Sequence, residues 1–566
     1  MGGETEAGTV PTGGWRSGPE QRRTGRAALR SRGAAADLTA APAPGGTEPD
    51  GLSGGRLAGE VRRLLAWAST TDSGDRAELP FEPHPRSWAA VSVGPRECPG
   101  AFRCPSGSSC LAEQARARAA SSQVVVVNTA LYTAHLAADA TVLPPHEVVV
   151  FDEAHEVEEI VTRGLGVEVT PGRLRAVVAT GRGLVDGQAG AGALQAVADG
   201  AARLEQLLAG LSDRRLRLGA GGRADAELAD LLVLLRGRLD TLADAVRRRP
   251  GASGAPEEAD VAPRRQRALL AMDHLAEDLA TVADPAIDQV VWATADGPAA
   301  GPVLRAAPVD VGQRLARDLW PSVTGVLTSA TVPPGLASRL GLPAAATDHI
   351  DVGSPFAYRQ STLLYVPLGI GDRRRPGSER AAHDEMVTLI EAAGGRTLAL
   401  FTSWRAMTEA AEAVRPRVTV PVLLQGEAPK PALLTRFADD EPTCLFATLS
   451  FWQGVDVPGR SASVVVIDRL PFPRPDDPLL QARRERAGDG AFAAVDLPRA
   501  ATLLAQGVGR LVRRATDRGV VAVLDPRLAT ARYRGTLLDA LPPMRRTVDR
   551  DHVVAFLRRI TAPERQ

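Results

Sequence analysis

Short runs of β-branched residues alternate with leucine-rich segments along much of the chain. Val124–Val127 and Val148–Phe151 are apolar at every position, which is typical of strands buried on both faces of a parallel sheet. Further strands are predicted at Val326–Leu327, Thr397–Phe401, Thr443–Ala447, Val464–Ile467 and Val520–Leu524, with helices between them such as Met407–Val414 and Ala500–Val512. The alternation predicts an α/β fold built on parallel sheets.

A different periodicity runs through residues 166–285. Leucines recur there at the i, i+3, i+4, i+7 spacing of an amphipathic helix, and the repeats are Leu204, Leu207, Leu208, Leu211; then Leu228, Leu231, Leu232, Leu235, Leu239; then Leu269, Met272, Leu275, Leu279. Connectors are expected at 219–223 and 251–256. The pattern predicts an antiparallel helical insert of about 120 residues.

The amino-acid composition of the N-terminal segment differs from that of the rest of the chain. Gly and Pro fill 15 of the first 50 positions, and Leu, Ile, Val, Met and Phe only four, so residues 1–55 are expected to be disordered or foreign to the fold. The 566 residues carry 67 basic and 67 acidic side chains, so net charge indicates no partner. Four cysteines, no signal peptide and no long apolar run predict a cytoplasmic protein without a membrane segment.

The first chemical motif follows the predicted strand Val148–Phe151, in the order Asp152-Glu153-Ala154-His155. Ligands bind at the carboxyl ends of the strands in open α/β sheets. Asp152 is suited to binding Mg²⁺, and Glu153 to orienting or deprotonating a water. The alternative is an acidic helix start, which the helix dipole favours without any catalytic role.

The second motif is Gln506-Gly-Val-Gly509-Arg510-Leu-Val-Arg513. On a continuous helix, Gln506, Arg510 and Arg513 would share one face. Guanidinium groups match phosphate oxygens, so the two arginines are candidates for holding a triphosphate. The alternative is an ordinary solvated basic face.

Together the two motifs resemble those of superfamily 2 helicases. Five more segments fit the same pattern: Val127–Leu131, Leu327–Thr331, Leu400–Trp404, Ser450–Gly459 and Asp468–Pro473. Their set and order are similar to the DinG/XPD family of iron–sulfur DNA helicases, on its bacterial DinG-like branch. The resemblance covers residues 60–560 approximately.

The resemblance implies two RecA-like parallel-sheet lobes. The expected parts are an incomplete first lobe at 56–165 with an iron–sulfur loop near 95–112, an arch-like insert at 166–285, a return to the first lobe at 286–350, and a second lobe at 351–566. It also implies an ATP- and Mg²⁺-dependent monomeric helicase that binds single-stranded or forked DNA and moves 5′–3′ along it, in DNA repair or replication.

Roles follow from the resemblance, residue by residue. The catalytic residues would be Asp152, Glu153, His155, Gln506, Arg510 and Arg513. Nucleotide binding and its coupling to DNA would involve Gly454, Asp456 and Gly509. Contacts with DNA are expected from Asn128, Thr129, Ser329, Thr331, Thr402 and Ser403.

The family carries a [4Fe-4S] cluster ahead of the acidic motif, held by four cysteines. Cys98, Cys104 and Cys110 stand at that place, and the fourth ligand is missing. Thiolates bind zinc as well as iron–sulfur clusters, so ligand chemistry alone does not choose between them. Cys444 lies in a predicted core strand and is expected to be a buried apolar residue.

One departure from the family concerns phosphate binding. A Walker A loop needs Gly-Lys-[Ser/Thr], whereas the single lysine of this chain, Lys430, stands between two prolines in the second lobe. The opening segment is therefore expected to replace the family's first strand and phosphate loop, through an alternative start, a truncated gene or a frame error. Two hypotheses remain: an active helicase, or a catalytically impaired remnant that binds DNA without turning over ATP. A zinc-dependent or nuclease-like enzyme is disfavoured, because the eight histidines show no metal-ligand spacing.

Overall fold

The computed structural model describes most of the chain beyond its first 53 residues. The described residues are 54–93, 98, 100–102, 104, 107–138, 141–210, 215–216, 223–248, 258–295, 301–440, 442–448, 451 and 462–562. They form two compact units. The first contains residues up to 149 together with 159–309 and 321–324, and the second contains 150–158, 310–320 and the chain from 325 onward.

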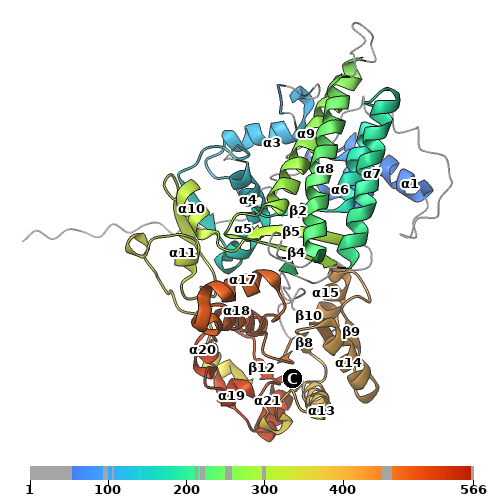
Figure 1. Ribbon diagram of the computed structural model, residues 1–566. Helices are drawn as coiled ribbons and strands as arrows, with labels where there is room; N and C mark the ends of the chain where they lie inside the picture. The colour runs from blue at the N-terminus through green and yellow to red at the C-terminus, as the bar shows by residue number, and fades with distance from the viewer. Residues whose placement is uncertain are drawn as a thin grey trace, which may run out of the picture. The chain divides into compact units, whose positions relative to one another are not determined.

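A seven-stranded sheet forms the centre of the second unit (Figure 1). Its strands are β7 (Thr362–Tyr365), β8 (Thr397–Phe401), β9 (Val422–Leu424), β10 (Cys444–Thr448), β11 (Val464–Ile467), β12 (Gly519–Val523) and β13 (Arg545–Thr547). They lie in the order β13-β7-β12-β11-β8-β10-β9, and every neighbouring pair is parallel. The predicted parallel α/β architecture is confirmed here.

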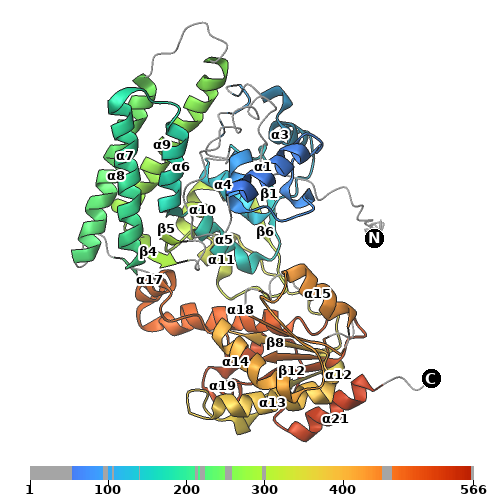
Figure 2. The same cartoon turned by 90° about the vertical axis from the view of Figure 1, so that its right-hand side faces the viewer.

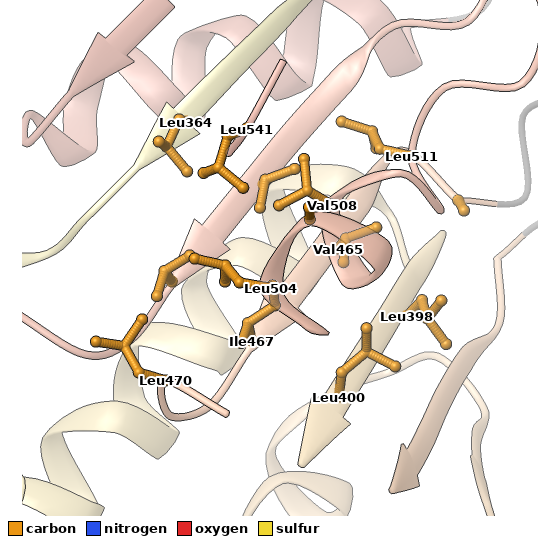
Figure 3. Close-up of a cluster of buried hydrophobic side chains, with 14 of the residues drawn as sticks. Leu364, Leu398, Leu400, Val465, Ile467, Leu470, Leu504, Val508, Leu511 and Leu541 are labelled. Carbon is orange, nitrogen blue, oxygen red and sulfur yellow. The ribbon is translucent and has the colours of Figure 1, made fainter. Parts of the chain in front are cut away.

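Helices cover both faces of this sheet. Those of the second unit are α10 (Gly312–Asp318), α11 (Leu336–Arg339), α12 (Tyr358–Ser361), α13 (Ser378–Ala393), α14 (Trp404–Val414), α15 (Lys430–Asp439), α17 (Pro478–Ala487), α18 (Leu497–Val508), α19 (Arg527–Thr530), α20 (Arg534–Asp539) and α21 (Arg550–Thr561). Alternate residues of each strand face opposite ways. Leu398, Leu400, Val465 and Ile467 pack with α18 in one core (Figure 3), while α13, α14 and α21 pack in the other.

The first unit is dominated by long helices (Figure 2). They are α6 (Pro171–Gly181), α7 (Gly187–Ala209), α8 (Arg223–Arg248) and α9 (Glu258–Ala283), and their leucine stripes face one shared core. Of the leucines that defined the predicted insert, Leu211 lies outside the described residues, as do most positions of the two connectors. Shorter helices of this unit are α1 (Gly54–Ala68), α2 (Pro85–Val91), α3 (Leu111–Ala120) and α4 (Thr129–Ala137), and α5 (Val157–Gly164) continues into it.

An antiparallel sheet packs against these helices, which the sequence pattern did not predict. It has the strand order β2-β5-β4-β3 and consists of β2 (Val167–Val169), β3 (Arg215–Leu216), β4 (Gln289–Ala295) and β5 (Pro302–Pro308). Val291 and Leu304 belong to the same core as the helices. Residues 289–308 therefore fold with the helical insert.

Single-turn elements complete the described secondary structure. They are η3 (Arg76–Glu78), η4 (Gly107–Ser109), η5 (Ala154–Glu156), η6 (Ala344–Ala346), η7 (Leu368–Ile370), η8 (Arg415–Arg417), η9 (Gly488–Gly490) and η10 (Phe492–Asp496), of which η10 is a π-helical turn.

A small sheet pairs β1 (Val148–Phe151) with β6 (Thr324–Leu327). The amide of Thr324 donates to the carbonyl of Glu147 at 2.7 Å and the amide of Thr328 to that of Phe151 at 2.9 Å, so the strands run parallel. Phe151 is buried, with its ring edge-on to Trp320. The opposite face is apolar and open, since Val148 is 56%, Val150 61% and Val326 41% exposed.

The predicted strand Val124–Val127 is wrong: this segment is not in a strand. Val124 and Val126 are exposed, and none of the described strands contains them. An apolar run becomes a strand only when a neighbour accepts and donates its backbone hydrogen bonds.

Candidate functional site

The acidic motif begins where β1 ends. Thr328, which directly follows β6, donates from its hydroxyl to Asp152 Oδ1 at 3.0 Å, and the amide of Glu153 donates to the same oxygen at 3.0 Å. The amide of Ala154 donates to the carbonyl of Thr328 at 2.9 Å. The end of β6 therefore fixes the Asp152 carboxylate, while Asp152 and Glu153 both stay exposed.

Glu153 has a backbone φ of 50°, in the left-handed region that non-glycine residues seldom adopt. The turn lets the chain leave β1 and enter η5, which contains Ala154 and His155. Such conformations persist where the surrounding structure enforces them, and they gather at functional sites.

His155 is the centre of the site. Its side chain is 8% exposed, and Nδ1 lies 2.8 Å from the hydroxyl oxygen of Ser329. The side-chain amide of Gln506 donates to His155 Nε2. These two hydrogen bonds correspond to the His155 tautomer in which Nδ1 carries the proton and donates to Ser329 Oγ. Ser329 Oγ also accepts the amide of Thr331 at 3.2 Å. Three of the sequence motifs thus meet on one imidazole.

The two predicted arginines do not share a helical face with Gln506. Helix α18 ends at Val508, with Gly509 as its C-cap, so Arg510 and Arg513 follow in a turn. The amide of Gly509 still bonds to the carbonyl of Ala505 at 2.8 Å, but that of Arg510 already bonds to Gly507 at 3.3 Å. The prediction of a continuous helix to Val512 is wrong, because glycine destabilises a helix by about 1 kcal/mol relative to alanine and two glycines occur here.

Lys430 lies nearer to this motif than its sequence position indicates. It is the first residue of α15, and its ammonium lies 5.0 Å from the centre of the Phe451 ring. Burial lowers the pKa of Lys430, and the positive charge of Arg510 lowers it further. Lys430 is therefore within electrostatic range of Arg510.

The predicted DNA-contacting residues stand mostly at helix starts. Asn128 caps α4 by accepting the amide of Leu131 at 2.8 Å, and Ser403 caps α14 by accepting that of Ala406 at 3.2 Å. Thr129 is the first residue of α4, and Thr402 precedes Ser403 at the carboxyl end of β8. Gly454 and Asp456 lie outside the described residues.

The four cysteines occupy two different environments. Cys444 is fully buried in β10, and burial raises the pKa of its thiol to about 12, which confirms it as a core residue. Cys98, Cys104 and Cys110 are half-buried. Among the described residues, no three His, Cys, Asp or Glu side chains are arranged to hold a metal ion.

Sequence reasoning missed Thr328 as a functional residue. Its signal was available: a hydroxyl residue directly after a strand that neighbours the acidic strand will face the same sheet edge.

Comparisons with known proteins decide the family. Residues 386–544 match the model of a helicase C-terminal domain. The chain is 42% identical over 520 residues to the ATP-dependent helicase DinG of Mycobacterium tuberculosis, covering 89% of this chain and 76% of that protein. The chain belongs to the DinG family of ATP-dependent helicases. Its motif-based resemblance to this family is confirmed.

Two further comparisons give one more curated relative and one solved structure. The ATP-dependent DNA helicase YoaA of Escherichia coli is 33% identical over 543 residues, covering 90% of this chain and 81% of that protein. A solved XPD helicase structure has a TM-score of 0.48 at 15% identity, covering 71% of this chain and 68% of that one. None of the helices that the structure describes combines the length and apolar character needed to cross a bilayer.

Proposed function

We propose that this chain is an ATP-dependent DNA helicase that moves 5′–3′ along single-stranded or forked DNA as a monomer, in DNA repair or replication. The observation that carries the proposal is the hydrogen-bonded set Ser329–His155–Gln506. It links the acidic motif to the Gln506 motif, which lies 351 residues away in the sequence. The identity to named ATP-dependent helicases supports the same reaction class.

The two acidic residues are suited to binding Mg²⁺ and activating water, and the two arginines to stabilising charge on the phosphoryl group. Asp152 offers a hard carboxylate at an exposed strand end, which fits Mg²⁺, and the ion would neutralise phosphate charge when bound. Glu153 is exposed beside it and would orient or deprotonate the attacking water. Arg510 and Arg513 would stabilise negative charge that develops on the phosphoryl oxygens.

His155 has a positioning role in this proposal. It is almost buried and is held from both ring nitrogens, so it fixes Gln506 relative to the strand end that carries Asp152. Ser329 and Thr331 lie within four residues of the end of β6, and a change in their backbone would be transmitted to His155.

Phosphate binding relies on arginine in this chain. The sequence has no Gly-Lys-[Ser/Thr], and Lys430 is its single lysine. A remnant that binds DNA without turnover is the alternative this leaves, and the comparisons give that alternative no support.

The iron–sulfur cluster remains a prediction from the family resemblance. Cys98, Cys104 and Cys110 are three ligands where the family has four, and no group of three metal-ligating side chains is found among the described residues. No step of the proposed reaction passes through such a group.

The experiment is DNA-stimulated ATP hydrolysis by the full chain. Glu153→Gln should lower kcat by about 100-fold or more, because it removes the group that activates water while keeping side-chain size. The matched control is Glu159→Gln, the same change on the following helix α5, where Glu159 pairs with Arg163 at 3.0 Å. It should leave kcat within about twofold of the unmodified protein, since exposed ion pairs contribute little.

Two results would contradict the proposal. One is the absence of DNA-stimulated turnover by the unmodified chain. The other is an equal loss in Glu153→Gln and Glu159→Gln, which would trace the effect to charge or folding.

A further inference from the structure

A cavity of about 470 Å³ lies in the second unit, outside the set of residues around His155. Its walls come from the segment after β11, from α17, from the π-helical turn η10 and from the α19–α20 region. Most small-molecule sites have volumes of about 300–1,000 Å³, so the space is adequate for a flat ring system.

Three aromatic rings form one wall of this cavity. Phe472 and Phe492 are stacked, with centroids 5.7 Å apart and planes at 28°. Tyr533 meets both, at 5.5 Å from Phe472 and 5.2 Å from Phe492. Phe472 and Tyr533 also pack against the core beneath, whereas Phe492 is 43% exposed. Two anchored rings therefore support a third that faces solvent.

The charges around the cavity are balanced. Arg484 donates to Asp496 at 2.7 Å, and Arg527 donates to Asp525 at 2.6 Å while its guanidinium lies 5.6 Å from the centre of the Phe472 ring. A lone phosphate would meet acids that already pair with these arginines, and a cation would meet the arginines. A neutral flat ring with hydrogen-bonding edges suits the site better, because it stacks on Phe492 and finds both donors and acceptors.

Exposed arginines stand at the rim of the cavity, each paired with an aspartate that another anion could replace. Arg474 pairs with Asp476 at 2.7 Å and Arg374 with Asp372 at 3.0 Å, and both arginine side chains are largely exposed. Arg374 lies within electrostatic range of Arg527 and Tyr533, which both line the cavity. Exposed pairs of this kind contribute little to stability, so a nucleic-acid phosphate can replace the aspartate without a large loss.

We infer that this cavity receives one unstacked base of single-stranded DNA, with Phe492 as the stacking surface and the rim arginines on the flanking phosphates. The inference rests on the proposed function. Phe492 opens the π-helical turn, a rare element that is frequent at functional sites. Gln506 comes ten residues after Asp496, about 15 Å along the axis of α18. The base site is thus separate from the ATP residues.

Binding of single-stranded oligonucleotides containing 2-aminopurine tests the inference, with the full chain and no nucleotide. The 2-aminopurine is placed between abasic positions, so that it is unstacked in the free strand and its emission should fall when it stacks on Phe492. Phe492→Leu keeps an apolar side chain but removes the ring, and should weaken binding about tenfold and abolish the quenching that stacking causes. Phe492→Tyr should restore both. The control Leu368→Ala truncates an apolar side chain of similar exposure elsewhere in the unit and should bind normally.

Each other outcome is decisive. Normal affinity and quenching in Phe492→Leu, with DNA-stimulated ATP hydrolysis intact, would overturn the base site and leave the proposed function standing. A proline-rich peptide that binds the unmodified chain but not Phe492→Leu, while DNA binding is unaffected, would make the cavity a peptide site. If the unmodified chain binds no single-stranded DNA, the proposed function and the base site both fail.

Discussion

Strands β11 and β1 have almost the same composition and opposite environments. Val464–Ile467 lies between β12 and β8, and all four of its side chains are fully buried. Val148–Phe151 pairs with β6, and one of its faces is open. A run of β-branched residues favours the extended backbone, but burial depends on neighbours contributed by distant parts of the chain. The same pattern therefore predicted the extended backbone of both strands, but it predicted burial correctly only for β11.

The largest expected effect comes from placing a charge in each strand. Val466→Asp puts a carboxylate into a fully apolar core and should destabilise the second unit by at least about 4 kcal/mol. Val150→Asp places the same group on an exposed face and should cost less than about 1 kcal/mol. Urea unfolding of both variants measures the difference. Comparable losses would mean that Val150 is buried in the folded protein, and the contrast would disappear.

The residues that follow the two strands offer a second test. Asp468 follows β11, is buried and pairs with Arg373 at 2.5 Å. Burial raises its pKa to about 6, against the opposing effect of Arg373. Because the folded pKa is above the unfolded value of 3.8, this group contributes stability that is fully present below about pH 4 and is lost as the pH rises through 6. The loss is on the order of 3 kcal/mol.

Comparison with Asp468→Asn isolates that contribution. The stability difference between the two proteins should shift in favour of the asparagine variant between pH 4 and pH 7. Denaturant midpoints at several pH values follow it. A difference that does not change with pH would contradict a raised pKa at Asp468.

Helix caps should give the smallest effect, and the same one in both units. Asn128→Ala removes the cap of α4 and Ser403→Ala that of α14, each at about 1 kcal/mol. A cap acts on the first turn of its own helix. The different surroundings of β1 and β11 should therefore not change the loss of stability. Thermal denaturation of the two variants tests this. A much larger cost at Ser403 would indicate a role beyond capping.

Local patterns predicted local structure well. Strands β8 and β11 have the predicted bounds, and β12 is displaced by one residue. The helical insert followed from its leucine spacing. The antiparallel pair β4–β5 was missed, since its sequence of small and apolar residues resembles no strongly patterned strand.

The site was predicted in its parts but not in its assembly. The sequence named His155, Ser329 and Gln506, yet no spacing rule indicates that one imidazole bonds to residues 174 and 351 positions away. Gly507 and Gly509 could have predicted the end of α18. The helical spacing of Gln506, Arg510 and Arg513 instead led to the prediction of a longer helix.

Lys430 has a practical consequence for experiments on this protein. It carries the single side-chain amine among 566 residues, and its pKa is lowered by burial and by Arg510. An amine-reactive fluorophore will therefore attach at one side chain, apart from the terminal amine, and the lowered pKa provides more of the reactive free base near neutral pH. Because Lys430 is within electrostatic range of Arg510, the unmodified sequence already contains an attachment point for a spectroscopic reporter close to the proposed phosphate site.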